Sequence, residues 1–147
     1  IIINPIYLMT TLSKIELSDI TRERIKTIDI YISDNESAFA DICITHNEIF
    51  YCLGTEDMRE DGHISITDRE FSHLYRGIIN ALKNDDCCSK FRSELIRFKV
   101  IISFVDAEKI SHNQATITPL SITQIIECLS NECDEFIFLE GFKSLLP

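Results

Sequence analysis

The sequence predicts an α+β fold, in which an antiparallel β-meander continues into a mixed sheet covered by two or three helices. Short segments in the first half of the chain alternate apolar and polar residues, which is typical of strands with one buried face. Two later segments repeat apolar residues every three or four positions, as amphipathic helices do. The 147 residues are 45% hydrophobic, enough for a single compact domain, residues 1–147, with its own core.

Three alternating segments predict the meander. In residues 28–33 every second residue is isoleucine, so Asp29 falls on the opposite face. A polar turn leads to a second alternating segment at residues 40–44, with Asp41 outward, and a third strand covers residues 48–53. The short connections favour antiparallel hairpins whose outward face collects the acidic side chains.

The first helix follows a polar region. Residues 54–62 are predicted as a loop, with a brief apolar run at residues 64–66. Thr67 and Glu70 have the spacing of a capping box, which predicts a helix over residues 68–83. Gly77 inside this helix favours close packing on a strand. Residues 84–89 end the helix.

Two further strands and a second helix are predicted after it. Residues 97–105 are apolar on both faces, as expected of a central strand covered on both sides. The polar residues 106–116 are predicted as a loop. Thr118 and Pro119 begin a helix that ends near Asn131, and residues 135–140 are predicted as a last strand. Residues 1–8 are interpreted as an upstream extension or an edge strand.

The charge of the chain is segregated. Residues 27–75 hold eleven acids and two bases, a net charge of −9 out of −10 for the whole chain. Residues 76–105 hold six bases and three acids. An acidic field of this kind repels phosphate backbones and attracts cationic surfaces, so we expect no nucleic-acid partner. No run of eighteen apolar residues occurs, so we expect no membrane span and a cytoplasmic location.

The six cysteines are expected to be free thiols, because a core of this size needs no disulfide staples. The spacing of Cys128 and Cys133, with His112 nearby in sequence, is a poor match to a zinc site. Cys88, beside Lys90, is the thiol with the best claim to a lowered pKa. No catalytic signature surrounds Cys88, and none surrounds His73 or His112. The sequence therefore predicts no catalytic residue, no metal ligand and no cofactor.

Residues 57–68 resemble the calcium loop of an EF-hand, with acids at its first and fifth positions and glycine at its sixth. Arg59 occupies the third position, where a carboxylate is expected, and Asp68 replaces the bidentate glutamate at the twelfth. We therefore expect a solvated acidic segment before a capped helix, without calcium binding.

The acidic side chains of the meander and the loop are the predicted binding surface for a basic protein, because opposite charge steers association. We expect the side chains on these strands and turns to form one exposed patch. The predicted partner-binding residues are Asp29, Asp34, Asp41, Glu48, Glu56, Asp57, Glu60 and Asp61.

In size, charge and hairpin-plus-helix organisation, the chain resembles the immunity proteins that bacteria make against secreted toxins, many of them nucleases. The resemblance implies a cytoplasmic protein that binds one basic toxin domain and blocks it. Two alternatives remain open. Secretion-system chaperones are similarly small and acidic, but they typically end in a helix rather than the strand predicted here. The other alternative is a small thiol-dependent enzyme acting through Cys88 or a loop histidine.

Overall fold

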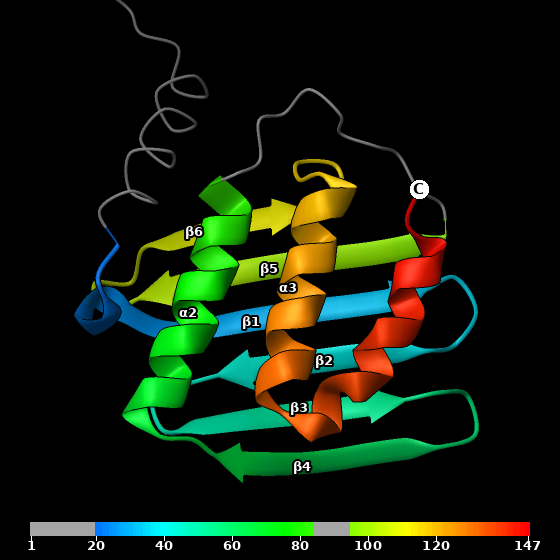
Figure 1. Ribbon diagram of the computed structural model, residues 1–147, viewed down its shortest axis with the longest axis horizontal. Coiled ribbons are helices and arrows are strands. Elements are labelled where there is room, and N and C mark those ends of the chain that lie inside the picture. Colours follow the sequence, from blue (N-terminus) through cyan, green and yellow to red (C-terminus); the bar gives the residue numbers. More distant parts are fainter. Residues whose placement is uncertain (1–19, 84–94) are drawn as a thin grey trace, which may run out of the picture.

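In the part of the chain that the structure describes, six strands form one antiparallel sheet with helices on one face (Figure 1). The computed structural model describes residues 20–83 and 95–147. The arrangement of the sheet and the helices confirms the α+β class and the helical cover. Its elements are η1 (Arg22–Arg24), β1 (Ile25–Asp34), β2 (Phe39–Ile44), β3 (Glu48–Gly54), β4 (Arg59–Ser65), α2 (Asp68–Lys83), β5 (Ile96–Phe104), β6 (Lys109–Asn113), α3 (Pro119–Glu132) and η2 (Asp134–Leu145).

The strands lie in the order β4-β3-β2-β1-β5-β6. The meander is confirmed and extends through β4, but every pairing in the described sheet is antiparallel, where a mixed sheet was expected. After β4, helix α2 crosses the strands from the β4 side of the sheet toward the β6 side (Figure 1). Strand β5 runs in the same direction as β4 and antiparallel to its neighbour β1.

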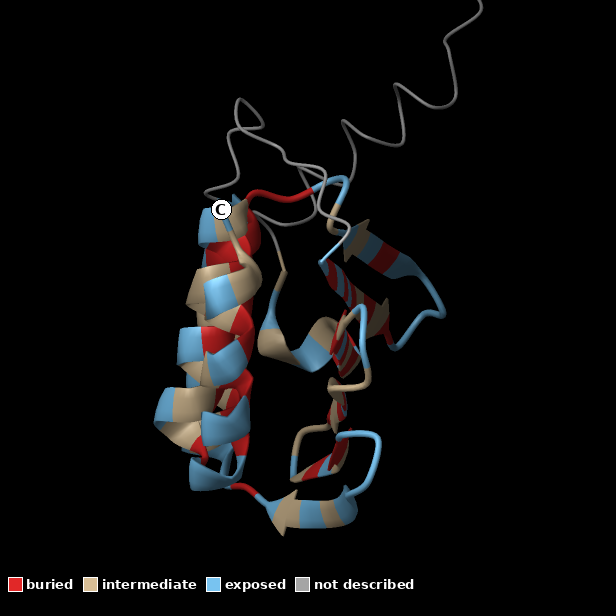
Figure 2. Ribbon diagram, turned by 90° about the vertical axis from the view of Figure 1, so that its right-hand side faces the viewer, coloured by how far each residue is buried: buried red, intermediate tan, exposed pale blue. Residues whose placement is uncertain are grey.

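The core lies between the sheet and the helices. The register pairs Ile30 of β1 with Ile42 of β2 and with Val100 of β5, so their side chains share one face of the sheet. Phe71 of α2 and Ile125 of α3 are fully buried against this face. Figure 2 shows the helices on one side of the strands, with buried residues alternating with less buried ones along the inner strands. One contiguous hydrophobic cluster therefore joins the two layers.

Strand β4 corrects the expected loop at residues 54–62. Only residues 55–58 form the turn, closed by a hydrogen bond of 2.7 Å from the Thr55 N–H to the Met58 carbonyl oxygen. The chain then pairs with β3 from Arg59 to Ser65. Most side chains of β4 are exposed because it is an edge strand, so it lacks the apolar alternation by which strands are recognised in a sequence.

The polar segment 106–116 is also not a simple loop, because it contains the second edge strand, β6. The turn between β5 and β6 includes Ala107 with φ of 70°, a left-handed conformation uncommon for alanine. Ile110 is the only buried residue of β6. A single apolar residue produces no periodic signal, and the strand was therefore missed.

Residues 135–140 form part of the 3₁₀ helix η2 rather than a strand. Its buried residues, Phe136, Leu139 and Phe142, recur at intervals of three, which is the repeat of a 3₁₀ helix. This spacing turns all three side chains toward the sheet and α3. The segment was mistaken for a strand because of its phenylalanine and isoleucine content, whereas its period was not two.

The predicted helix starts are confirmed. The Glu70 N–H donates to the Thr67 hydroxyl oxygen at 3.1 Å, and the Thr67 N–H donates to the Glu70 carboxylate at 3.0 Å. Thr118 caps α3 by accepting from the Ser121 N–H. Gly77 of α2 does allow a close approach, but to Cys128 of α3 rather than to a strand. Residues 1–8 and 84–89 lie outside the described residues.

Candidate functional site

The face of the sheet opposite the helices, here called the helix-free face, carries most of the strand acids. Successive residues of a strand point to opposite faces, and the isoleucines of β1 and β2 point to the helices. Asp29 of β1, Asp41 of β2 and Asp61 of β4 therefore lie on the helix-free face, as does Glu48 of β3. Asp41 and Asp61 both lie opposite Cys52 of β3, which places the two carboxylates on one row across three strands.

The other predicted binding residues lie elsewhere. Glu60 points from β4 to the helix-covered face, since its neighbour Asp61 points to the other. Glu56 and Asp57 are exposed in the turn between β3 and β4. Asp34 accepts hydrogen bonds of 2.9, 2.9 and 3.0 Å from the N–H groups of residues 36, 37 and 38, and so closes the turn after β1. The expectation of one patch is wrong, because period-two alternation divides the loop acids once they form a strand.

The charge on the helix-free face follows the order of the strands. Its carboxylates lie on β1 to β4, whereas Arg97, Lys99 and Lys109 lie on β5 and β6. Arg59 is a cation on the acidic side, but its guanidinium donates to the Asp61 carboxylate at 3.3 Å. Asp29 and Asp41 have no ion-pair partner within 4.0 Å among the described residues. The acidic part of this face therefore keeps unneutralised charge.

Two aromatic side chains are exposed among these acids. Tyr31, in register with Asp41, is 40% exposed, and Phe50, in register with Cys43, is 47% exposed. Both rings lie on the helix-free face, on the two strands that flank β2. Interfaces between proteins are enriched in such rings.

The described thiols are held in their protonated form. Burial, followed by a hydrogen bond to Asp29, raises the pKa of Cys43 to about 11. Burial also raises the pKa of Cys128 and of Cys133 to about 11. A hydrogen bond to Asp61 is the main cause that raises the pKa of Cys52. Because the thiolate is the nucleophile and the metal ligand, these environments disfavour both roles. Cys88 lies outside the described residues.

The side chain of His73, one of the two histidines named from the sequence, contacts a carboxylate rather than one of these thiols. His73 of α2 contacts Glu132 of α3, with 3.0 Å between Nδ1 and Oε1. The Cys128 thiol instead faces the carbonyl oxygens of residues 73 and 74, at 3.9 and 3.8 Å. His112 belongs to strand β6 rather than to a loop. The described residues contain no group of three or more histidine, cysteine or acidic side chains arranged to hold a metal ion.

Residues 57–68 do not have the shape of a calcium loop. Most of this segment is the extended strand β4, which at about 3.3 Å per residue separates its ends by about 20 Å. Asp57 precedes the strand and Asp68 follows it, where its carboxylate pairs with Arg22. The first and last ligand positions of an EF-hand converge on one ion, and an extended strand prevents this.

A pocket of about 300 Å³ opens where the hairpin of β3 and β4 meets η2. Its walls include Leu53 and Met58 from the hairpin and Phe138 from η2, with Glu60 and Glu135 among the lining residues. Glu135 and Phe138 are not among the residues predicted from the sequence, which predicts a strand at residues 135–140. The three-residue spacing of buried side chains in this segment was the available signal.

No helix in the described part of the chain is long and apolar enough to cross a membrane. No family model matches the chain, and no curated protein matches it.

Proposed function

We propose that the protein binds a basic protein surface through the acidic part of its helix-free face, and that it neutralises this partner as a toxin-immunity protein does. The observation that carries the proposal is the uncompensated charge of Asp29 and Asp41 beside the exposed rings of Tyr31 and Phe50. Aromatic residues supply much of the binding energy at interfaces, and the carboxylates supply orientation and selectivity.

The arrangement of charge favours one approach direction. The acids lie toward the β4 edge of the helix-free face and the bases lie toward the β6 edge. A cationic partner is therefore attracted to one half of the face and repelled by the other. Such a field raises the association rate and rejects acidic competitors, because like charges brought together at an interface cost free energy.

Association kinetics test this proposal directly. The partner to test is a basic domain encoded by a gene next to that of this protein, produced in an inactivated form. We expect Asp41→Lys to lower the association rate constant about tenfold at low salt, and the wild-type rate to fall steeply as salt rises. Glu108→Lys is the matched control, since Glu108 is an exposed acid in the turn between β5 and β6.

The Glu108 variant is expected to associate within about twofold of wild type, because its charge change lies away from the acidic half. Equal rates for wild type and Asp41→Lys would contradict the proposal. So would an acidic partner, or an association rate that does not depend on salt.

Secretion-system chaperones remain the second binding-class alternative. The strand predicted at residues 135–140 counted against these chaperones, but η2 occupies that segment instead. Function separates the two: an immunity protein abolishes the activity of its folded partner, whereas a chaperone keeps an effector soluble without inhibiting it. Assaying the partner's activity with and without the protein distinguishes them. The thiol-dependent enzyme stays a hypothesis that involves Cys88 or a loop histidine. The raised pKa values of Cys43, Cys128 and Cys133 disfavour those three thiols as nucleophiles.

A further inference from the structure

The pocket between the β3–β4 hairpin and η2 lies on the side of β4 opposite the helix-free face. It encloses about 300 Å³, at the lower end of the range for ligand sites and suited to a single long side chain. Leu53 is a buried wall residue, whereas Met58 is 76% exposed and Phe138 is 38% exposed. The Phe138 ring contacts the ring of Phe142 edge to face, with 5.8 Å between centroids, which fixes one wall in place.

Two carboxylates from different elements converge on this pocket. Glu60 comes from β4 and Glu135 from η2, and both line the cavity. Burial raises the pKa of the Tyr51 hydroxyl, and the charges of Glu60 and Glu135 raise it further. Neither carboxylate has a cation within 4.0 Å in the described residues. The nearest lining cation, Arg59, is held by Asp61.

An apolar wall with an aromatic ring, topped by two unpaired carboxylates, matches the chemistry of one kind of side chain. Arginine has an aliphatic stem that packs on apolar surface and a planar guanidinium with five N–H donors. The guanidinium stacks on aromatic rings and bridges carboxylates, which the compact ammonium group of lysine does less well. We propose, building on the proposed function, that this pocket receives an arginine side chain of the basic partner.

A small probe tests the pocket without the partner. Acetyl-Gly-Arg-Gly-amide is titrated into ¹⁵N-labelled protein, and the backbone amide signals are followed by NMR. The matched probe replaces arginine with citrulline, which has the same shape without the charge. We expect saturable shifts at Gly54, Thr55 and Met58 with the arginine peptide, at a dissociation constant on the order of 1–10 mM, and at least fivefold weaker binding of the citrulline peptide.

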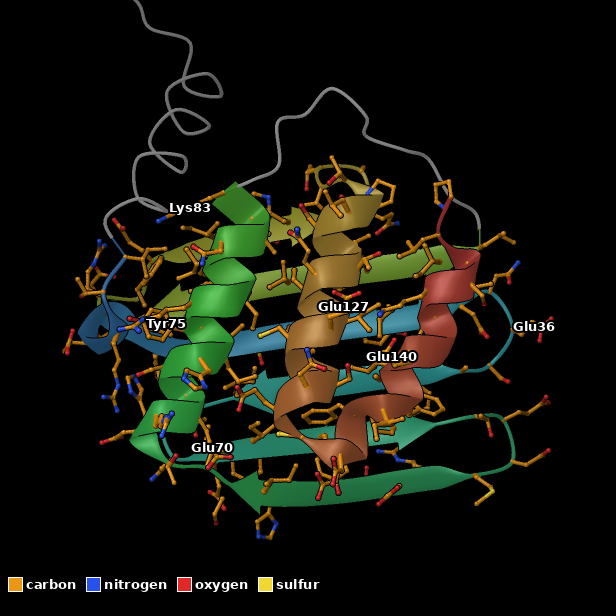
Figure 3. All side chains as sticks on the ribbon, in the orientation of Figure 1. Glu36, Glu70, Tyr75, Lys83, Glu127 and Glu140 are labelled. Carbon is orange, nitrogen blue, oxygen red and sulfur yellow. The ribbon has the colours of Figure 1, made fainter. Side chains whose placement is uncertain are left out.

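Variants of the chain locate the binding. Glu60→Gln combined with Glu135→Gln removes both charges with little change of shape, and should weaken the arginine peptide at least fivefold. Glu36→Gln is the matched control, because Glu36 lies in the turn after β1 and projects away from the fold (Figure 3). It should leave the affinity within about twofold, as expected for an exposed charge outside the pocket.

Several results would overturn the inference. These are no pocket shifts up to about 100 mM peptide, equal shifts from the two peptides, or equal weakening by the control and the double variant. Failure of the proposed function is a separate result: Asp41→Lys would then leave partner association unchanged. If Asp41→Lys slows association while the double variant binds partner and peptide as wild type does, only the arginine pocket is disproved.

Discussion

Gly62 illustrates how much one hydrogen atom matters in this sheet. The phenol ring of Tyr51 lies across Gly62 on the neighbouring strand, and a Cβ atom there would meet the Tyr51 hydroxyl oxygen at 2.4 Å. An aromatic ring over an edge glycine shields the strand and helps to fix its register. The same ring contacts Phe136 of η2 edge to face at 5.6 Å between centroids. Gly62 therefore links the pairing of β4 to the position of η2.

We predict that Gly62→Ala lowers the free energy of unfolding by about 1–3 kcal/mol, because the methyl group must displace Tyr51. Urea denaturation measures the change. Gly141→Ala is the control, since no atom lies within 4 Å of a Cβ built at Gly141. That variant should be neutral or stabilising by up to about 1 kcal/mol. Equal losses in the two variants would mean that Tyr51 does not lie over Gly62.

The buried thiols predict how stability depends on pH. The pKa of Cys133 rises from 9.0 to about 11 on folding, with burial as the main cause, and Cys128 behaves in the same way. The unfolded chain then loses these protons near pH 9, while the folded chain keeps them until about pH 11. Unfolding therefore releases protons in this window, and the free energy of unfolding falls as pH rises through it.

We predict that the decrease between pH 8.5 and 10.5 is smaller in Cys128→Ala than in wild type, because one of the three thiols whose pKa is raised to about 11 is absent. Urea denaturation at each pH measures it, and comparison within the pair of proteins cancels the lysine and tyrosine titrations. An identical pH dependence in both proteins would contradict the assignment.

At the scale of elements, the contact between α2 and α3 depends on a glycine facing a cysteine. A Cβ atom at Gly77 would meet the Cys128 sulfur at 2.5 Å. Alanine in place of a helical glycine ordinarily gains about 1 kcal/mol of helix propensity, so the clash and the propensity oppose each other here. The contact gives α2 and α3 their close approach.

A double-mutant cycle separates the two effects. We predict that Gly77→Ala destabilises the wild-type protein but not the Cys128→Ala variant, in which the sulfur is absent. The coupling free energy between the two sites should be at least about 1 kcal/mol. Strict additivity in denaturant unfolding would show that the helices do not approach at these residues.

The 3₁₀ helix η2 makes a prediction that the strand hypothesis does not share. A strand at residues 135–140 would place Phe136 and Phe138 on one face, with similar costs of truncation. In η2, Phe136 is fully buried and Phe138 is 38% exposed. We predict a loss of about 3–5 kcal/mol for Phe136→Ala and a much smaller loss for Phe138→Ala, measured by urea denaturation. Equal losses would favour the strand.

Strands and helices with one buried face were predictable from the sequence, and the edge strands of the sheet were not. Alternating isoleucines revealed β1 and β2 because burial of one face imposes a period of two. The acidic edge strand β4 has no buried side chain, so its sequence is that of a loop. The candidate site was predictable to the same extent. Alternation placed Asp29 and Asp41 correctly on the helix-free face. Glu60 and Asp61 lie on opposite faces of β4, a strand that the sequence pattern does not show.

At the scale of the whole molecule, the charged side chains where helices pack are paired, whereas part of the acidic charge on the helix-free face is not. The α3–η2 contact uses compensated charge, because Lys143 bonds Glu127 at 3.0 Å and Glu140 at 2.6 Å. Figure 3 shows Glu127 and Glu140 between the two helices. On the helix-free face Asp61 pairs with Arg59, whereas Asp29 and Asp41 have no ion-pair partner within 4.0 Å among the described residues. Repulsion among such carboxylates opposes folding, since it is relieved when the chain expands.

We predict that the melting temperature rises by about 2–4 °C when sodium chloride is raised from about 10 to 150 mM, because screening weakens this repulsion. Asp41→Asn should raise the melting temperature at low salt and reduce its salt dependence. Glu108→Gln should do neither, as it removes one charge from outside the acidic half. The same salt response in all three proteins would mean that the repulsion is spread over the whole surface.

Strand β4 is an edge strand with Asp61 on one face and Glu60 on the other. Its outer edge pairs with no strand in the described part of the chain. An isolated rim of this kind is where a sheet frays first, so the amide protons of β4 should exchange with solvent through local opening long before those of β1. A partner that contacted both faces of β4 would suppress this local opening. Slower amide exchange along β4 would then report binding at the helix-free face and at the pocket in a single measurement.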